Sequence, residues 1–124
     1  MTVPHRFPTS EEYTKVFVTS THWLQKPQRK LLEAHLRSPA HTVTASTLAE
    51  QMGYDTYSAV NMLYGNLASA VSKRLKKLGV PWEVPTGEPA SSSLVVFERE
   101  GSEAHWRWVM RPELVEALVA LGWK

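Results

Sequence analysis

Residues 44–78 constrain the fold of this chain most strongly, because they contain two helix signals in tandem. Thr44 can accept a hydrogen bond from an unpaired backbone N–H and so begin a first helix. Gly53 ends that helix, since glycine tolerates the left-handed conformation of a sharp turn. Asp55 or Thr56 can then cap a second, longer helix. The stretch therefore predicts a helix-turn-helix.

The second predicted helix, residues 56–78, has an apolar face and a polar face. Apolar side chains recur along it at steps of three and four residues, which predicts a buried stripe. This stripe consists of Val60, Leu63, Tyr64, Leu67, Val71, Leu75 and Leu78. The opposite face is small and polar at first and basic towards its end, and it consists of Ser58, Met62, Gly65, Asn66, Ser69, Ser72, Lys73 and Lys76. This exposed face is the strongest functional signal in the sequence.

A glycine inside the second helix needs a physical explanation. Gly65 lies opposite the apolar stripe, where it costs about 1 kcal/mol of helix stability relative to alanine. A close approach by DNA or by another protein would explain it, and a kink without any partner is the third interpretation. We favour DNA and leave the other two open.

Basic residues are clustered rather than spread along the chain. The formal net charge is only +2, but Lys73, Arg74, Lys76 and Lys77 crowd the end of the long helix. Such a cluster can bind phosphate groups, or it can simply complement the negative end of the helix dipole, and both interpretations stand. A second basic cluster precedes the motif and consists of Lys26, Arg29, Lys30 and Arg37.

The size and composition of the chain indicate a single domain. With 124 residues, of which 43% are hydrophobic, it can bury one core but is short for two. It has no cysteine, which excludes disulfides and thiolate zinc sites. No window reaches the roughly 18 apolar residues of a membrane span. We therefore expect one cytoplasmic domain over residues 1–124, with residues 1–9 flexible and with no membrane partner.

Capping residues predict helices before the helix-turn-helix, and alternating segments predict strands after it. Thr9 and Glu12 form a capping-box pattern for a first helix. A second helix is predicted at Gln25–Arg37, with a proline in its first turn. Alternating segments at Leu94–Glu98 and Ala104–Met110 predict a β-hairpin.

The remaining segments are short. Ala40–Val43 is predicted to be an extended segment that can pair with the hairpin. Residues 86–93 are rich in turn formers and are predicted to form a mobile loop. Arg111-Pro112-Glu113 is predicted to begin a last helix that ends at Gly122. His35 falls on an apolar helix face, where a packed histidine is the more usual outcome than a ligand or a base.

The predicted hairpin contains aromatic and acidic residues. Alternation places Trp106, Trp108 and Met110 on one face, and we assign this face to the core rather than to a platform that stacks bases. Three glutamates lie within residues 98–103. Because they repel phosphate, the hairpin tip is a poor candidate for contacting DNA.

The order of these elements predicts an α+β, mostly helical fold. Helices, then a helix-turn-helix, then a β-hairpin make a winged helix-turn-helix with a β-hairpin wing and an additional C-terminal helix. In that architecture the second helix of the motif lies in the major groove of DNA.

Two stretches resemble a known family of domains. The run LAEQMGYDTYSAVNMLYGNLASAV and the run WRWVMRPELVEALVALGW look like the winged-helix-like accessory domain of bacterial HNH endonucleases of the modification-dependent restriction type. The resemblance spans residues 31–123, and its most specific parts are Gly53-Tyr54, Ala59-Val60-Asn61, Tyr64-Gly65 and Arg111-Pro112-Glu113-Leu114. It implies a bacterial, DNA-associated role, such as presenting DNA to a nuclease or sensing DNA modification.

The resemblance does not extend to catalysis. The five histidines are scattered, and no pair of acidic residues has metal-ligand spacing. Neither a nucleophile elbow nor a phosphate-binding glycine loop is present. We therefore predict no enzymatic activity, no metal and no cofactor.

Our main hypothesis is a non-catalytic domain that binds double-stranded DNA with the helix at 56–78. The residues assigned to this surface are Ser58, Asn61 and Asn66 at base edges or sugars, Ser69 and Ser72 at phosphates, and Lys73 and Lys76 as sources of positive charge. Asn61 is the sharpest candidate for base recognition because asparagine can pair bidentately with adenine, although it can equally be an ordinary surface amide.

The alternative is a module that docks a protein, such as a nuclease, another effector or a second copy of the chain. Met62 favours this view, because a soft apolar side chain suits a protein interface. A third hypothesis is a small transcriptional autoregulator, which would need a dimer and a palindromic site. The sequence leaves the oligomeric state open.

Overall fold

A computed structural model describes residues 7–80, 89–98 and 106–123 of the chain. These residues form an α+β fold that is mostly helical, with a small antiparallel sheet of three strands. In chain order the elements are α1 (Ser10–Phe17), the 3₁₀ helix η1 (Ser20–His22), α2 (Lys26–Arg37), the 3₁₀ helix η2 (Pro39–His41), β1 (Thr42–Thr44), α3 (Ala45–Met52), α4 (Tyr57–Lys77), the 3₁₀ helix η3 (Ala90–Ser93), β2 (Val95–Glu98), β3 (Arg107–Met110) and α5 (Pro112–Ala120).

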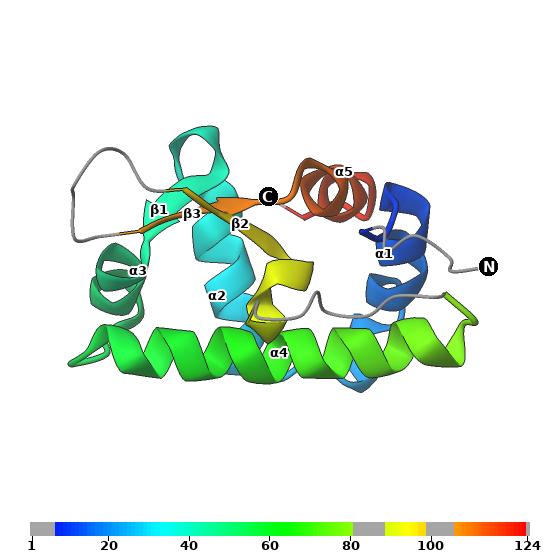
Figure 1. The fold of residues 1–124 in the computed structure, drawn as a ribbon, viewed down its shortest axis with the longest axis horizontal. Helices are drawn as coiled ribbons and strands as arrows, with labels where there is room; N and C mark the ends of the chain where they lie inside the picture. The colour runs from blue at the N-terminus through cyan, green and yellow to red at the C-terminus, as the bar shows by residue number, and fades with distance from the viewer. Residues whose placement is uncertain (1–6, 81–88, 99–105, 124) are drawn as a thin grey trace.

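The long helix α4 sets the shape of the molecule. It runs along one edge, and the sheet and α3 lie over its first half (Figure 1). Helices α1 and α5 pack on each other over its second half, and α2 crosses between the two groups. One face of α4 therefore packs mainly against α1, α2, α3 and η3, while its other face is left to solvent.

The predicted helix pair is confirmed. The Thr44 hydroxyl accepts from the backbone N–H of Thr47 at 3.1 Å and caps α3. Gly53 ends α3 with a φ of 77°, the left-handed conformation that glycine adopts without strain. Thr56 occupies the N-cap position of α4 in an extended conformation, but its side chain makes no capping hydrogen bond. The turn of four residues between α3 and α4 therefore follows from the glycine and the polar residues after it.

The buried stripe of α4 differs from the prediction at two positions, Leu63 and Leu78. Val60, Tyr64, Leu67, Val71 and Leu75 are buried as predicted, and Ala68 joins them. Leu63 is only half-buried. Leu78 is 49% exposed, because α4 ends at Lys77 and leaves Leu78 beyond the last turn that packs on the core.

The N-terminal elements follow their capping signals. The Thr9 hydroxyl and the Glu12 carboxylate form the predicted capping box at the start of α1. Phe7, Pro8 and Thr9 are not a free tail: Pro8 is buried, and the Arg111 guanidinium lies 3.3 Å from the centroid of the Phe7 ring. Of the segment expected to be flexible, residues 1–6 lie outside the described residues.

The sheet has the strand order β1-β3-β2, and both pairings are antiparallel. The predicted hairpin is confirmed as β2 and β3, with Phe97 opposite Trp108, and β1 pairs on the other side of β3 with Val43 opposite Trp108. Trp108 and Met110 face the core, but Trp106 precedes β3 and is 47% exposed. Assigning Trp106 to the core was therefore wrong, because the sheet begins one residue later. The connecting residues 99–105 lie outside the described residues.

The serine-rich segment differs from the predicted loop in the part that the structure describes. Ala90–Ser93 form η3, which packs on α4, and Ser91 to Ser93 are buried. The Tyr13 hydroxyl donates a hydrogen bond to the Ser93 carbonyl, which ties η3 to α1. Hydrogen bonds of this kind satisfy the buried carbonyl groups of Ser92 and Ser93, whereas the Ser92 hydroxyl is enclosed and has no hydrogen-bond partner among the described residues. Residues 86–88 lie outside the described residues.

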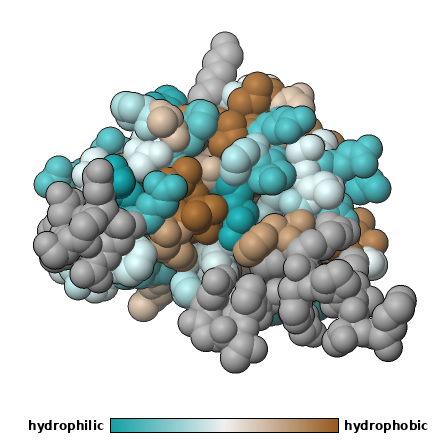
Figure 2. Space-filling view, turned by 45° about the horizontal axis from the view of Figure 1, so that its top comes forward, coloured by the Kyte–Doolittle hydropathy of each residue, from teal (hydrophilic) through white to brown (hydrophobic). Residues whose placement is uncertain are grey.

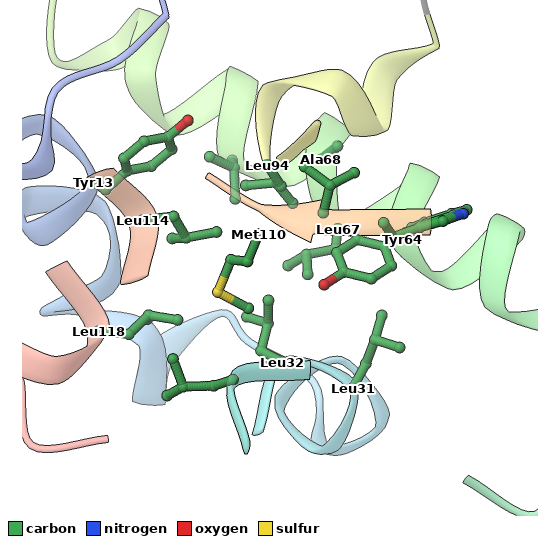
Figure 3. Packing of buried hydrophobic residues seen from close by; sticks show 14 of the residues in the cluster. Tyr13, Leu31, Leu32, Tyr64, Leu67, Ala68, Leu94, Met110, Leu114 and Leu118 are labelled. Atoms are coloured by element: carbon green, nitrogen blue, oxygen red, sulfur yellow. The ribbon is translucent and has the colours of Figure 1, made fainter. Parts of the chain in front are cut away.

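The core brings the middle of α4 together with β3 and α5. Met110 of β3 lies between Leu114 and Leu118 of α5 on one side and Tyr64 and Leu67 of α4 on the other (Figure 3). All five side chains are 0–1% exposed. Burial of each such side chain stabilises the fold by about 2 kcal/mol. Packing against several elements of the core therefore fixes the position of α4.

Candidate nucleic-acid interface

The polar face of α4 is turned to solvent as a continuous surface. Six of the seven predicted DNA-binding residues have exposed side chains, namely Ser58, Asn61, Asn66, Ser69, Lys73 and Lys76. At 3.6 residues per turn, the seven predicted residues span an arc of about 140°. Ser72 is the exception: its hydroxyl oxygen is enclosed and has no hydrogen-bond partner among the described residues. In this conformation Ser72 is therefore not available to a phosphate.

The charges on α4 are all of one sign. The helix has four basic residues, Lys73, Arg74, Lys76 and Lys77, and no acidic residue over its 21 positions. The last three lie in the final turn, where positive charge complements the helix dipole. Lys73 lies outside that turn, so the dipole does not account for it. An all-positive helix end is also suited to phosphate groups.

A shallow groove follows one edge of the exposed arc. It has a volume of about 330 Å³. It is lined by Asn66, Ser69, Ala70, Lys73, Arg74 and Lys77. Amide, hydroxyl and ammonium groups along one groove are the donors that proteins direct at phosphate and sugar oxygens. We call this surface the basic groove.

Two arginines of the predicted basic clusters pack on tryptophans. The Arg74 guanidinium carbon lies 4.6 Å from the centroid of the Trp23 ring, and that of Arg29 lies 4.1 Å from the centroid of Trp123. Such cation–π contacts contribute to packing as well as to charge. The cations of α4 that point into solvent are consequently the lysines.

Gly65 has open space around it. A side-chain carbon built at this position would meet no atom within 4 Å. No contact within the described part of the chain therefore requires glycine here, although α4 would be more stable with alanine. The interpretations that remain are an external partner that comes close to the backbone and a glycine without a partner.

The first half of the exposed arc is less polar than the second. Met62 is 69% exposed, and Tyr57, at the first position of α4, is 56% exposed. The beginning of α4 thus offers apolar surface, and its end offers charge.

A second hollow lies at the beginning of α4, between that helix, α3 and the sheet. It has a volume of about 460 Å³. It is lined by Thr44, Ala45, Ser46, Tyr57, Asn61, Phe97, Trp106 and Trp108. We call it the aromatic cleft. Its rings come from three separate segments, so the cleft could not be predicted from the sequence; the one signal of it was Trp106, which the alternating pattern assigned to the core.

A third cleft lies at the junction of β3 and α5 and is mostly apolar. Its lining includes Val109, Val115 and Val119, and none of the lining residues belongs to α4. On the face that carries the sheet and α5, apolar residues form separate patches among hydrophilic ones (Figure 2). This cleft is separate from the α4 surface.

His35 is a packed histidine, as expected from its apolar helix face. It is 0% exposed, its Nδ1 lies 2.5 Å from the Tyr64 hydroxyl, and its Nε2 lies 2.8 Å from the Trp108 carbonyl oxygen. A carbonyl only accepts, so Nε2 bears the proton and Nδ1 accepts from Tyr64. Burial lowers the pKa of His35 to about 4, which keeps the ring neutral near pH 7.

The described residues contain no group of three or more histidine, aspartate or glutamate side chains placed to hold a metal ion. Within the same residues, no helix combines the length and the apolar character needed to cross a membrane. At the hairpin, Glu98 is exposed and lies opposite Arg107 in the strand register. The other two glutamates of the predicted acidic tip lie outside the described part of the chain.

Comparisons with known proteins found no family model, no curated protein and no solved structure that matches this chain.

Proposed function

We propose that the chain is a non-catalytic DNA-binding module of the winged-helix type, with α4 as its recognition helix. The chain order α2, β1, α3, α4, β2, β3 and the sheet order β1-β3-β2 support this architecture. Helices α1 and α5 are additions to it, and they pack against each other at the far end of α4. In such a module the second helix of the pair enters the major groove of a duplex.

The observation that carries the proposal is the exposed arc of α4, which is polar, basic and free of acidic residues. A helix presented to water for solubility alone normally mixes charges of both signs. An arc with charges of one sign next to a groove of amide and hydroxyl groups is suited to a polyanion.

The side chains along the arc have different proposed tasks. Lys73 and Lys76 neutralise phosphates, and Asn66 and Ser69 line the basic groove, where they position the sugar-phosphate backbone. Ser58 and Asn61 lie in the first two turns of α4, the part of a recognition helix that contacts base edges. The enclosed Ser72 is left out of the surface.

The resemblance to accessory domains of HNH endonucleases supports a role in bacterial restriction or defence. In that setting the module would hold DNA for a nuclease and would contribute no catalytic residue of its own. A cytoplasmic location belongs to the same proposal.

A titration of the protein into a short mixed-sequence duplex, followed by fluorescence anisotropy at low and moderate salt, tests the proposal. The test variant is Lys73→Glu/Lys76→Glu. Its matched control is Lys15→Glu/Lys30→Glu, which makes the same charge change at exposed lysines of α1 and α2. Each protein is first checked for an unchanged thermal unfolding transition.

We expect the wild type to lose affinity steeply with salt. In the test variant, removal of two phosphate contacts should lower the slope of log K against log salt by about 2, and the control should retain the wild-type slope. Equal weakening in both variants would show that net charge, not α4, governs binding. If the wild type does not bind at low salt, the proposal is wrong.

A second candidate function is protein docking, and it is favoured by Met62, which lies in the first half of the exposed arc and is 69% exposed. A methionine at this position can pack into a partner's apolar pocket. In sedimentation experiments, self-association that is insensitive to salt and is lost in Met62→Lys would support docking by a second copy of the chain. A monomer at all concentrations would count against that form of docking.

A further inference from the structure

The aromatic cleft at the beginning of α4 has the character of a site for a flat ring. We propose that it binds one unpaired nucleobase, held by stacking on its aromatic side chains. The inference deepens the proposed function and rests on it for the strand that carries the base. It adds a site for a single base to a surface otherwise suited to a duplex.

Half of the residues that line the cleft are aromatic. Two of the four rings are exposed to solvent, Tyr57 at 56% and Trp106 at 47%. Trp108 is buried, with 6% of its surface exposed, and Phe97 is half-buried. Stacking on such rings accepts any base, because every base has a π-face. Several aromatic side chains gathered on one cleft form the kind of contiguous apolar surface that marks a binding site.

The inner rings of the cleft are held in place before any ligand arrives. Trp108 contacts Phe97 edge-on, with ring centroids 4.9 Å apart, and its centroid lies 5.2 Å from that of Tyr64. Tyr64 is in turn hydrogen-bonded to His35, which also binds the Trp108 carbonyl. A wall that is already ordered loses little conformational entropy when a ligand binds.

The polar groups of the cleft suit a neutral ligand with donors and acceptors. The Asn61 amide and the Ser46 hydroxyl line it, and neither forms a hydrogen bond within the described part of the chain. An amide can pair with the edge of a base. No lining residue is charged. A cleft built for a cation would gain from a carboxylate, so the composition favours a neutral heterocycle.

The cleft and the basic groove are within reach of one strand. Asn61 lines the cleft and Lys73 lines the groove. These residues are twelve positions apart on α4, which corresponds to about 18 Å at the rise of an α-helix. At roughly 3.4 Å per nucleotide in B-form DNA, that distance is about five steps. They are also about 120° apart around the helix axis, so a strand that crosses the exposed arc obliquely can place one base in the cleft and phosphates at the lysines.

Three duplexes of one sequence test the inference by fluorescence anisotropy. The first is fully paired, the second carries one extra unpaired adenosine, and the third carries an abasic residue at that same position. The protein variants are Tyr57→Ala/Trp106→Ala, which removes the exposed rings, and Tyr57→Phe/Trp106→Phe, which keeps them. Thermal unfolding of each variant verifies that the fold is intact.

For the wild type, the extra adenosine should improve affinity about 5- to 150-fold over the abasic duplex, the range of one stacked base. The alanine variant should lose this preference and the phenylalanine variant should keep most of it. Equal affinity of the wild type for these two duplexes, or a preference that survives in the alanine variant, would overturn the inference.

The paired duplex separates this inference from the proposed function. If it binds and the extra base brings no gain, only the inference is overturned; if none of the duplexes binds, both fail. A preference for the extra adenosine without binding of the paired duplex would support the cleft and contradict duplex recognition. Stronger competition by tetramethylammonium chloride than by equal sodium chloride would identify a cation site and overturn the inference.

Discussion

The Tyr64 hydroxyl donates a hydrogen bond to Nδ1 of His35 at 2.5 Å, and this bond joins α4 to α2 inside the core. Both side chains are 0% exposed. The other ring nitrogen of His35 donates to the Trp108 carbonyl oxygen at 2.8 Å, so the same histidine also holds β3. The proposed recognition helix and the inner ring of the aromatic cleft therefore share one buried polar junction.

Tyr64→Phe should destabilise the protein by about 1–3 kcal/mol, because it leaves Nδ1 of His35 buried without a donor. The free energy of unfolding from urea titration measures the effect. Tyr54→Phe is the control, since Tyr54 is half-buried and has no hydroxyl hydrogen bond among the described residues; its change should stay within about 0.5 kcal/mol. Equal effects of the two substitutions would show that the Tyr64–His35 bond contributes nothing specific.

Acid should weaken the fold through His35. Burial lowers the pKa of this residue to about 4 in the folded protein, whereas an exposed histidine titrates near 6.5. The unfolded state therefore binds the proton first as the pH falls. The stabilisation is complete above about pH 6.5 and is lost as the pH falls towards 4, by about 3 kcal/mol in total.

His35→Gln isolates this contribution, because glutamine has a donor and an acceptor but no proton to gain. Urea unfolding of both proteins at several values between pH 7 and pH 4 gives the comparison. The wild type should lose more stability over this interval than the variant does. Parallel curves would mean that carboxylates and other histidines account for all of the acid sensitivity.

Much of this fold could be predicted because its signals are local. The Thr9 capping box, the Thr44 cap and the left-handed Gly53 each satisfy backbone groups within a few residues of themselves, so a single sequence shows them. The alternating hairpin segments likewise paired in an antiparallel register.

The missed features all depend on contacts between distant segments. The sequence of Ser91 to Ser93 is typical of a loop, yet these residues are buried in η3, which packs on α4. The Ser93 carbonyl accepts a hydrogen bond from the hydroxyl of Tyr13, 80 positions away in the chain. The aromatic cleft contains residues of β1, α3, α4, β2 and β3. Ser72 was predicted to be exposed, but its hydroxyl is enclosed. Helical periodicity identifies the face of a residue, but not what covers the edge of that face.

Gly65→Ala and Gly53→Ala should change stability in opposite directions. A side-chain carbon at either position would meet no atom within 4 Å, so only the backbone distinguishes them. Gly65 is helical, and alanine there should stabilise the protein by about 0.5–1 kcal/mol. Gly53 has a φ of 77°, where alanine should cost about 1–2 kcal/mol. Urea unfolding of the two variants measures both.

The same Gly65→Ala protein tests why glycine occurs in α4. If DNA comes close to the backbone at this position, the variant should bind a duplex more weakly even though it is more stable. Unchanged affinity would favour a glycine without a partner on that face. A lower stability would mean that α4 is not a regular helix at this point.

Arg74→Ala and Lys77→Ala should separate packing from DNA binding at the end of α4. Arg74 is half-buried with its guanidinium carbon 4.6 Å from the centroid of Trp23, so its loss should cost about 1 kcal/mol of stability. Lys77 is exposed and lines the basic groove. Its removal should change stability by less than about 0.5 kcal/mol but lower the salt slope of duplex binding by about 1.

Urea unfolding gives the free energy of unfolding of each variant, and anisotropy at several salt concentrations gives the salt slope of duplex binding for each. We expect Arg74→Ala to lower the free energy of unfolding more than Lys77→Ala does. Lys77→Ala should keep the wild-type stability, but its duplex binding should depend less on salt. A large loss of stability in Lys77→Ala would contradict its exposed position. If Lys77→Ala keeps the full wild-type salt slope, Lys77 makes no phosphate contact. The slope must then be assigned to Lys73 and Lys76.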